Sequence, residues 1–190
     1  MKKYELTSEF VTNAFGKKLF RIKALVAFGN VEKGELGGFV ENENNLSHNG
    51  NAWVSDDALV FGDALVSGNA RVFDDARVFG DARVFGNALV FGYAQVSGDA
   101  QVSGDALVFG DADYAVVKGF GRFSRATTFF RCKDKILRVQ CGCFYGDMTQ
   151  FREIVKKTHG DSKNAKEYLA IADLMELHFS DEEEKQEAAQ

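Results

Sequence analysis

Cysteine and histidine are the residue types in this chain that most readily supply metal ligands, nucleophiles or general bases. There are three of each, and Cys132, Cys141 and Cys143 could form a Cys3His zinc set with His159. Their spacing differs from that of the common zinc knuckles, and an odd number of clustered cysteines is not a secreted disulfide framework. We therefore predict reduced cysteines that pack as small hydrophobic side chains, with no metal and no cofactor.

A basic segment begins at residue 114 and mixes cations with aromatic rings. Counting Lys and Arg against Asp and Glu gives 12 − 7 = +5 for residues 114–180. Proteins use this mixture to bind single strands, because rings stack on bases and cations meet phosphates. A hairpin with one apolar and one solvated face would show the same composition. The cations expected to form a basic surface are Arg122, Arg125, Arg131, Lys133 and Arg138.

A six-residue repeat between Asn51 and Asp113 defines the scaffold. Its unit is roughly Ala-x-Val-Phe/Ser-Gly-Asp/Asn, with valine at 54, 60, 66, 72, 78, 84, 90, 96, 102 and 108 and an alanine two residues before each valine. Residues two apart leave the same side of a strand, so these alanines and valines share one face. Glycine followed by Asp or Asn is turn chemistry, and a period of six is typical of a β-helix.

The repeat resembles the hexapeptide-repeat family, whose chains wind as a left-handed parallel β-helix of triangular section with three hexads in each coil. Three further segments look like uncharacterised phage and prophage proteins of this kind: Gly34-Glu-Leu-Gly-Gly, Asn45-Leu-Ser and Gly142-Cys-Phe-Tyr-Gly-Asp-Met-Thr-Gln-Phe. The resemblance implies a mainly-β fold built on such a β-helix.

The best-known members of that family are trimeric acyltransferases that bind an acyl-coenzyme A and use a histidine base in a loop projecting from a coil. Here no histidine lies between Val54 and Asp113. His48 is either a general base or a turn residue, and His159, which precedes a glycine, is expected to cap a helix dipole. Acyl transfer therefore stays an alternative.

A coil of eighteen residues would stack every third hexad, which assigns each outward side chain to one face. The face of Val54, Val72, Val90 and Val108 has the most apolar outward residues, and an apolar surface of this size is expected to be covered. We predict that a second subunit of a dimer or trimer, or the C-terminal module, covers it; the alternative is that its aromatic ladder only stabilises neighbouring coils. The predicted interface residues are Trp53, Phe73, Leu89, Phe91, Leu107 and Phe109.

The same stacking aligns acidic and amide residues at the corners. Asp63, Asp81 and Asp99 would form one column, and Asn69, Asn87 and Asp105 another. Turn formation explains most of these residues. Residues 51–113 nevertheless carry 3 − 10 = −7, so the acidic surface could collect cations or imitate the phosphates of a duplex.

The chain is expected to have four parts: residues 1–50 as a cap with degenerate coils, 51–113 as the β-helix, 114–180 as an α+β module, and 181–190 as a disordered acidic tail. The cap should contain a strand in 18–28. Leu46 and Val54 are eight residues apart, which predicts a two-residue insertion. The module is expected to form a hairpin with arms 126–132 and 135–141, a helix capped by Asp147 and Gln150, and a second helix over 164–179.

The longest apolar runs are too short to cross a bilayer, and the first residues do not form a signal-peptide core. We expect a cytoplasmic protein without a membrane partner, in the host cytoplasm if it is phage-encoded. The leading hypothesis is a non-enzymatic interaction protein that inhibits a host defence complex, as an anti-CRISPR protein does, or a nucleic-acid-handling complex, through its acidic surface. A hexapeptide-class acyltransferase is the alternative, and a small-ligand sponge with sites between subunits is the third.

Overall fold

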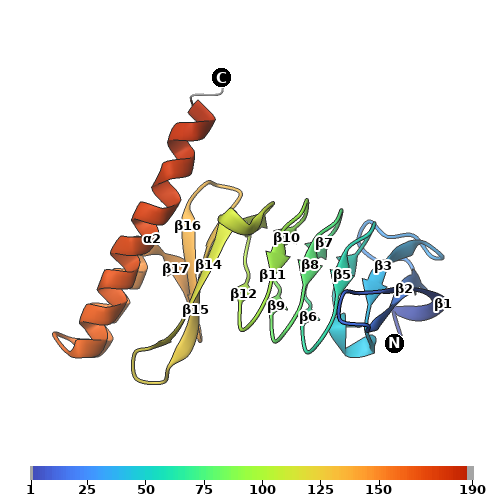
Figure 1. The fold of residues 1–190 in the computed structure, drawn as a ribbon, viewed down its shortest axis with the longest axis horizontal. Coiled ribbons are helices and arrows are strands. Elements are labelled where there is room, and N and C mark those ends of the chain that lie inside the picture. Colours follow the sequence, from blue (N-terminus) through green and yellow to red (C-terminus); the bar gives the residue numbers. More distant parts are fainter. Residues whose placement is uncertain (1, 188–190) are drawn as a thin grey trace. The chain divides into compact units, whose positions relative to one another are not determined.

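The computed structural model describes residues 2–187, with the surroundings of side chains up to Ser180. The chain divides into two units, Met1–Ala112 and Asp113–Gln190, which are described separately (Figure 1). The cap and the repeat belong to the first unit. The second unit begins one residue before the expected start of the C-terminal module.

The hexad repeat folds into short parallel strands that stack in three sheets, joined by tight corners (Figure 1). Val54 pairs with Val72, and Val72 pairs with Val90, so one coil takes eighteen residues and the three-hexad coil is confirmed. The strands are β4 (Trp53–Val54), β5 (Leu59–Val60), β6 (Leu65–Val66), β7 (Arg71–Val72), β8 (Arg77–Val78), β9 (Arg83–Val84), β10 (Leu89–Val90), β11 (Gln95–Val96), β12 (Gln101–Val102) and β13 (Leu107–Val108).

The interior of the β-solenoid is the predicted column of alanine and valine. Every repeat alanine and valine from Ala52 to Val108 is at most 1% exposed. Successive coils are joined by backbone hydrogen bonds; for example, the Phe61 N–H donates to the Val78 carbonyl at 3.0 Å. Burial of a valine contributes about 1.5–3 kcal/mol before the entropy of ordering the chain, so the stacked column stabilises an otherwise thin structure.

Glycine is required at corners where coils meet closely. Gly86 has φ +73°, and a Cβ there would lie 2.8 Å from the Gly104 nitrogen. Asp56 and Asp74 take the equivalent position at φ 56°, a conformation that aspartate tolerates better than most residues. The corners therefore form at the glycine and aspartate residues from which the sequence predicts turns.

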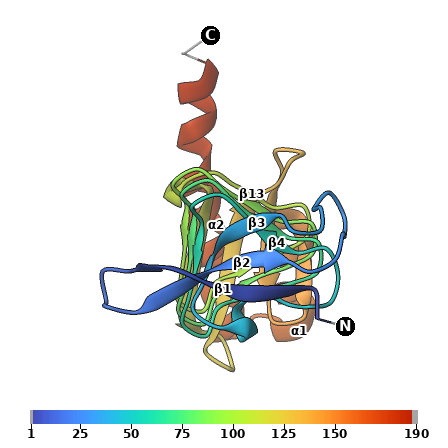
Figure 2. The same ribbon diagram turned by 90° about the vertical axis from the view of Figure 1, so that its right-hand side faces the viewer.

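The N-terminal cap begins with an antiparallel hairpin of β1 (Tyr4–Thr12) and β2 (Lys18–Ala24), which crosses the end of the coils (Figure 2). The expected strand in 18–28 is confirmed as β2, whereas β1 was not anticipated. A third strand, β3 (Leu36–Val40), joins the cap to the solenoid by pairing in parallel with β5.

The degenerate coil that follows β3 contains the short 3-10 helix η1 (Glu43–Asn45). Val40 pairs with Val60, and Leu46 bridges to Val66. The two residues of each pair are twenty positions apart in sequence, whereas residues paired between regular coils are eighteen apart. The two-residue insertion predicted between Leu46 and Val54 is therefore present.

The second unit is an antiparallel sheet in the order β14-β15-β16-β17, with two helices packed on one face (Figure 1). The expected hairpin is confirmed as β15 and β16. Strands β14 and β17 extend this hairpin to a four-stranded sheet, so the prediction of one hairpin and two helices was incomplete. The short 3-10 helix η2 (Asp111–Asp113) contains the boundary between the units. The elements of the second unit are β14 (Tyr114–Phe120), β15 (Arg125–Arg131), β16 (Leu137–Cys141), β17 (Phe144–Asp147), α1 (Met148–His159) and α2 (Lys163–Glu187).

Helix α1 begins as predicted, with reciprocal capping bonds between Asp147 and Gln150. Helix α2 continues to Glu187, beyond the predicted end at Phe179. It therefore includes much of the segment 181–190 that was expected to be disordered; the remaining residues 188–190 lie outside the described part. Within residues 2–187, neither helix is long and apolar enough to cross a membrane.

Candidate functional site

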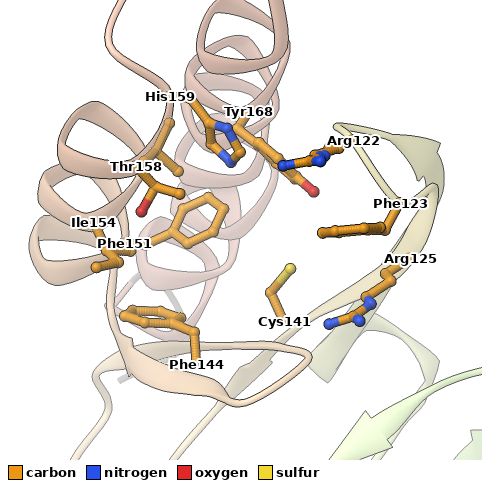
Figure 3. Close-up of a pocket in the computed structure, with 11 residues that line it drawn as sticks. Arg122, Phe123, Arg125, Cys141, Phe144, Phe151, Ile154, Thr158, His159 and Tyr168 are labelled. Carbon is orange, nitrogen blue, oxygen red and sulfur yellow. The ribbon is translucent and has the colours of Figure 1, made fainter.

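A pocket of about 210 Å³ opens in the second unit between the sheet and its helices (Figure 3). The turn between β14 and β15 supplies Arg122 and Phe123, and α2 supplies Tyr168. The remaining lining residues come from β15, β16, β17 and α1: Arg125, Cys141, Phe144, Phe151, Ile154, Val155, Thr158 and His159.

The floor of the pocket is aromatic. Phe151 is buried on α1, and its ring centroid lies 5.7 Å from that of Phe144 and 5.9 Å, edge to face, from that of Tyr168. Val155 follows one helical turn after Phe151 and is also buried. The floor therefore suits a flat apolar group.

Two guanidinium groups stand at the mouth. Arg122 and Arg125 lie over the ring of Phe123, at 5.3 Å and 4.9 Å from its centroid, and both side chains are exposed. Among the described residues, neither forms an ion pair with a carboxylate. These cations are available to an anionic ligand.

Contacts with α2 hold the turn that carries Arg122. Gly121 has φ +70°, and a Cβ at this position would overlap the Tyr168 ring, so the turn approaches α2 through a glycine. The Gly121 N–H donates to Glu167 Oε2 at 3.3 Å, and the Tyr168 hydroxyl donates to the Phe120 carbonyl at 3.4 Å. The mouth of the pocket is thereby positioned by the helix.

Besides the two arginines, the lining residues with polar groups are Cys141, Thr158, His159 and Tyr168 (Figure 3). Cys141 Sγ accepts a hydrogen bond from Thr127 Oγ1 at 3.2 Å. Burial is the main cause of a raised pKa at Tyr168, and the neighbouring Cys141 raises this pKa further. The phenol therefore stays protonated. His159 ends α1 as predicted and stacks on Tyr168 with centroids 5.8 Å apart. Among the described residues, the lining thus contains hydrogen-bond donors and no carboxylate.

Of the five predicted basic residues, two line this pocket. Arg138 pairs with Asp134 at 2.7 Å. The Arg131 guanidinium donates to the Phe179 carbonyl and lies 4.0 Å from Asp113, so both arginines are engaged within the module. Lys133 is exposed in the β15–β16 turn. Sequence reasoning found Arg122 and Arg125 but missed the aromatic floor, because its residues come from separate elements.

The predicted interface face needs one correction. Trp53 is 1% exposed because Tyr4 and Phe28 of the cap pack against it, so it cannot contact another subunit. On the same face, Phe73 stacks on Phe91 at 4.9 Å, and Phe91 meets Phe109 at 5.2 Å. Leu89 and Leu107 are half-buried, whereas Phe109 is 58% exposed. The ladder joins neighbouring coils, and the interface stays a prediction.

The predicted corner columns are present. Asn51 donates to Asn69, Asn69 to Asn87 and Asn87 to Asp105, with distances of 3.2, 3.1 and 3.2 Å. In the acidic column, Asp63 and Asp81 are exposed and Asp99 is half-buried. Roles of these carboxylates in binding cations or partners stay predictions.

His48 packs within the cap, and the three cysteines differ in burial. His48 Nδ1 accepts a hydrogen bond from the Lys3 backbone N–H at 3.2 Å, and its ring lies 4.5 Å from that of Tyr4. Cys132 is buried, Cys141 is half-buried and Cys143 is exposed. Within the described part of the chain, no three His, Cys, Asp or Glu residues form a group that could hold a metal ion.

Comparison with known families identifies the solenoid. Residues 82–98 and 100–112 match the model described as the YdcK beta solenoid repeat. Together with the stacked coils, this match supports a β-solenoid repeat of the hexapeptide type in this chain. The comparison with curated proteins gives no match.

Proposed function

We propose that this chain is a non-enzymatic binding protein whose C-terminal module holds a ligand combining a flat ring with an anionic group. The observation that carries the proposal is the pair of guanidiniums stacked on Phe123 beside an aromatic floor. A ring would fill the slot, while its anionic group meets Arg122 and Arg125 at the mouth. Charge-assisted hydrogen bonds from arginine to phosphate or carboxylate are among the stronger polar contacts in proteins.

A single nucleotide is the ligand class that best fits these features. Its base presents a face to aromatic side chains, and its phosphate is a ligand for guanidinium groups. A volume of about 210 Å³ lies below the 300–1,000 Å³ typical of pockets for drug-sized molecules. The pocket would therefore take one base, as a free nucleotide or at the end of a single strand.

Calorimetric titration of the full chain with adenosine monophosphate tests the proposal. Adenosine and inorganic phosphate serve as partial ligands, and we expect each to bind at least about tenfold more weakly than the nucleotide, because each makes only one class of contact. Recovery of unchanged nucleotide after incubation would support binding without turnover.

Two variants locate the binding. We expect the double substitution Arg122→Gln and Arg125→Gln to weaken nucleotide binding by at least about tenfold, while Phe123→Leu should weaken binding of nucleotide and nucleoside alike. The matched control is Arg77→Gln, which removes an exposed arginine from β8 in the other unit. The proposal fails if no nucleotide binds, or if the double variant binds as the unchanged chain does.

The solenoid supports a second part of the proposal, a rigid acidic surface for a protein partner such as a host complex that handles nucleic acid. Asp63 and Asp81 are exposed at one corner, and Asp57 and Asp75 at another. A partner with a groove made for phosphates should bind the solenoid more weakly as salt rises, because salt screens exposed charges. The substitutions Asp63→Asn and Asp81→Asn should weaken such a complex; salt-independent binding would contradict this part.

A further inference from the structure

A second pocket, of about 190 Å³, lies wholly within the first unit, where the cap meets the first coils. One wall is the turn Gly29–Asn30 with Val31, and the other is formed by side chains of two successive coils. The coil residues that line it are Asn51, Trp53, Asn69 and Arg71. This pocket is separate from the proposed nucleotide site and shares no residue with it.

The charges lining this pocket favour an anion. Among the described residues that line it, Arg71 is the only ionisable one and none carries a carboxylate. Arg71 is half-buried, and within the described part of the chain no acidic side chain forms an ion pair with it. A half-buried guanidinium favours a negatively charged partner because burial removes part of its hydration.

Amide groups next to Arg71 add further hydrogen-bonding capacity. The corner ladder ends at Asn51, whose Nδ2 donates to Asn69, and the turn at Gly29 lies against its other side. Together with the Arg71 guanidinium, the side-chain amides of Asn51 and Asn69 supply N–H donors around this pocket, as a site for an oxyanion requires.

The cap holds the opposite wall in place. Phe28 and Val31 exchange two backbone hydrogen bonds, at 3.0 Å and 2.8 Å, and Phe28 packs edge to face on Trp53 at 5.4 Å. A Cβ on Gly29 would lie 3.3 Å from Asn51 Cβ, so the turn lies directly against the end of the ladder. The pocket is a fixed feature of the junction between cap and solenoid.

We infer that this junction is a binding site for a small oxyanion, a phosphate or carboxylate group held by Arg71 and the asparagine amides. Such a group could be a free ion or part of a larger ligand. The inference is independent of the proposed nucleotide site, because its residues belong to the other unit.

Trp53 provides a direct assay because it is the only tryptophan in the chain and lines this pocket. The full chain is titrated separately with phosphate and with acetate at constant ionic strength set by sodium chloride. We expect a saturable change in tryptophan fluorescence with at least one of the two ions. Saturation with phosphate alone, with acetate alone or with both supports the site and defines its preference.

Matched variants separate specific binding from a general salt effect. Arg71→Gln should weaken the ion's affinity by at least about tenfold, as expected for loss of a charged hydrogen-bond donor. Arg77→Gln and Arg83→Gln, at the same repeat position on the other two faces, should leave the affinity unchanged. Asn51→Ala tests the amide contribution, and circular dichroism checks that each variant is folded.

Two results would overturn the inference. The first is the absence of a saturable signal with either ion, confirmed by unchanged asparagine side-chain amide resonances in NMR spectra. The second is an unchanged affinity in folded Arg71→Gln. Because the proposed nucleotide site lacks tryptophan and is tested with Arg122 and Arg125 variants, either site can fail without the other.

Discussion

Lys3 connects the cap to the first coil through a buried ammonium group. The residue is 4% exposed, and its Nζ donates to the Ala52 carbonyl at 2.8 Å and the Gly50 carbonyl at 3.3 Å. Nζ also lies 4.6 Å from the centre of the Phe28 ring. No carboxylate within the described residues forms an ion pair with it. Burial lowers the pKa of Lys3 from 10.5 to about 8.

This lowered pKa makes the stability of the first unit depend on pH with a defined sign. Below about pH 8 the amine is protonated in both the folded and unfolded chain, so its contribution is constant. Between about 8 and 10.5 the unfolded chain binds more protons, so the free energy of unfolding rises with pH. The difference between these two pKa values corresponds to at most about 3–4 kcal/mol. The two carbonyls and the Phe28 ring favour the charged form and therefore reduce this effect.

Urea unfolding followed by Trp53 fluorescence at several pH values between about 7 and 10.5 measures this effect, because Trp53 lies in the first coil. Lys3→Met removes the titrating group, so the stability of the unchanged chain relative to this variant should rise with pH. Lys2→Met is the matched control, since Lys2 is exposed and pairs with Glu43 at 2.6 Å. A difference that stays flat or falls with pH would refute the reasoning.

Three further substitutions test the solenoid, each by urea unfolding. Val78→Ala should cost about 2–3 kcal/mol, because it removes buried methyl groups and leaves a cavity; a cost near zero would mean that the coils collapse around it. Asn69→Ala should cost about 1 kcal/mol, since it breaks two exposed ladder bonds, whereas no loss would show that these bonds form equally well with water. Gly86→Ala should cost at least about 2 kcal/mol and more than Gly98→Ala, because both have positive φ but only Gly86 faces backbone within 4 Å; equal costs would contradict that close approach.

The solenoid could be predicted from the sequence because its rules are local. A strand places residues two apart on one side, and a corner needs glycine or a residue that tolerates positive φ. These rules recur in every hexad, so the inward column and the insertion after Leu46 followed from them, whereas the coil of three hexads came from the resemblance to the hexapeptide-repeat family. Strand β1 was missed because it is largely exposed, with only Tyr4 fully buried along it, and therefore lacks clear apolar alternation.

The burial of Trp53 and the two pockets depend on contacts between residues far apart in sequence. Trp53 belongs to the most apolar face of the solenoid, but whether the cap or a second subunit covers it depends on where Phe28 folds back. The lining of the C-terminal pocket is drawn from a turn, the sheet and both helices. The cluster of arginines around Phe123 was the one local signal of that pocket.

The uniform interior of a hexapeptide solenoid also explains where its binding chemistry lies. Alanine and valine in every hexad fill each coil in the same way, so coils stack with their inward side chains at most 1% exposed and without room for a ligand. A pocket needs side chains of unequal size or a break in the stacking. Both occur where non-repeat segments begin: at the cap, where the Gly29–Asn30 turn lies against Asn51, and in the module after residue 113. Substitutions outside the repeat should therefore alter ligand binding more readily than substitutions of its alanines and valines, which should alter stability.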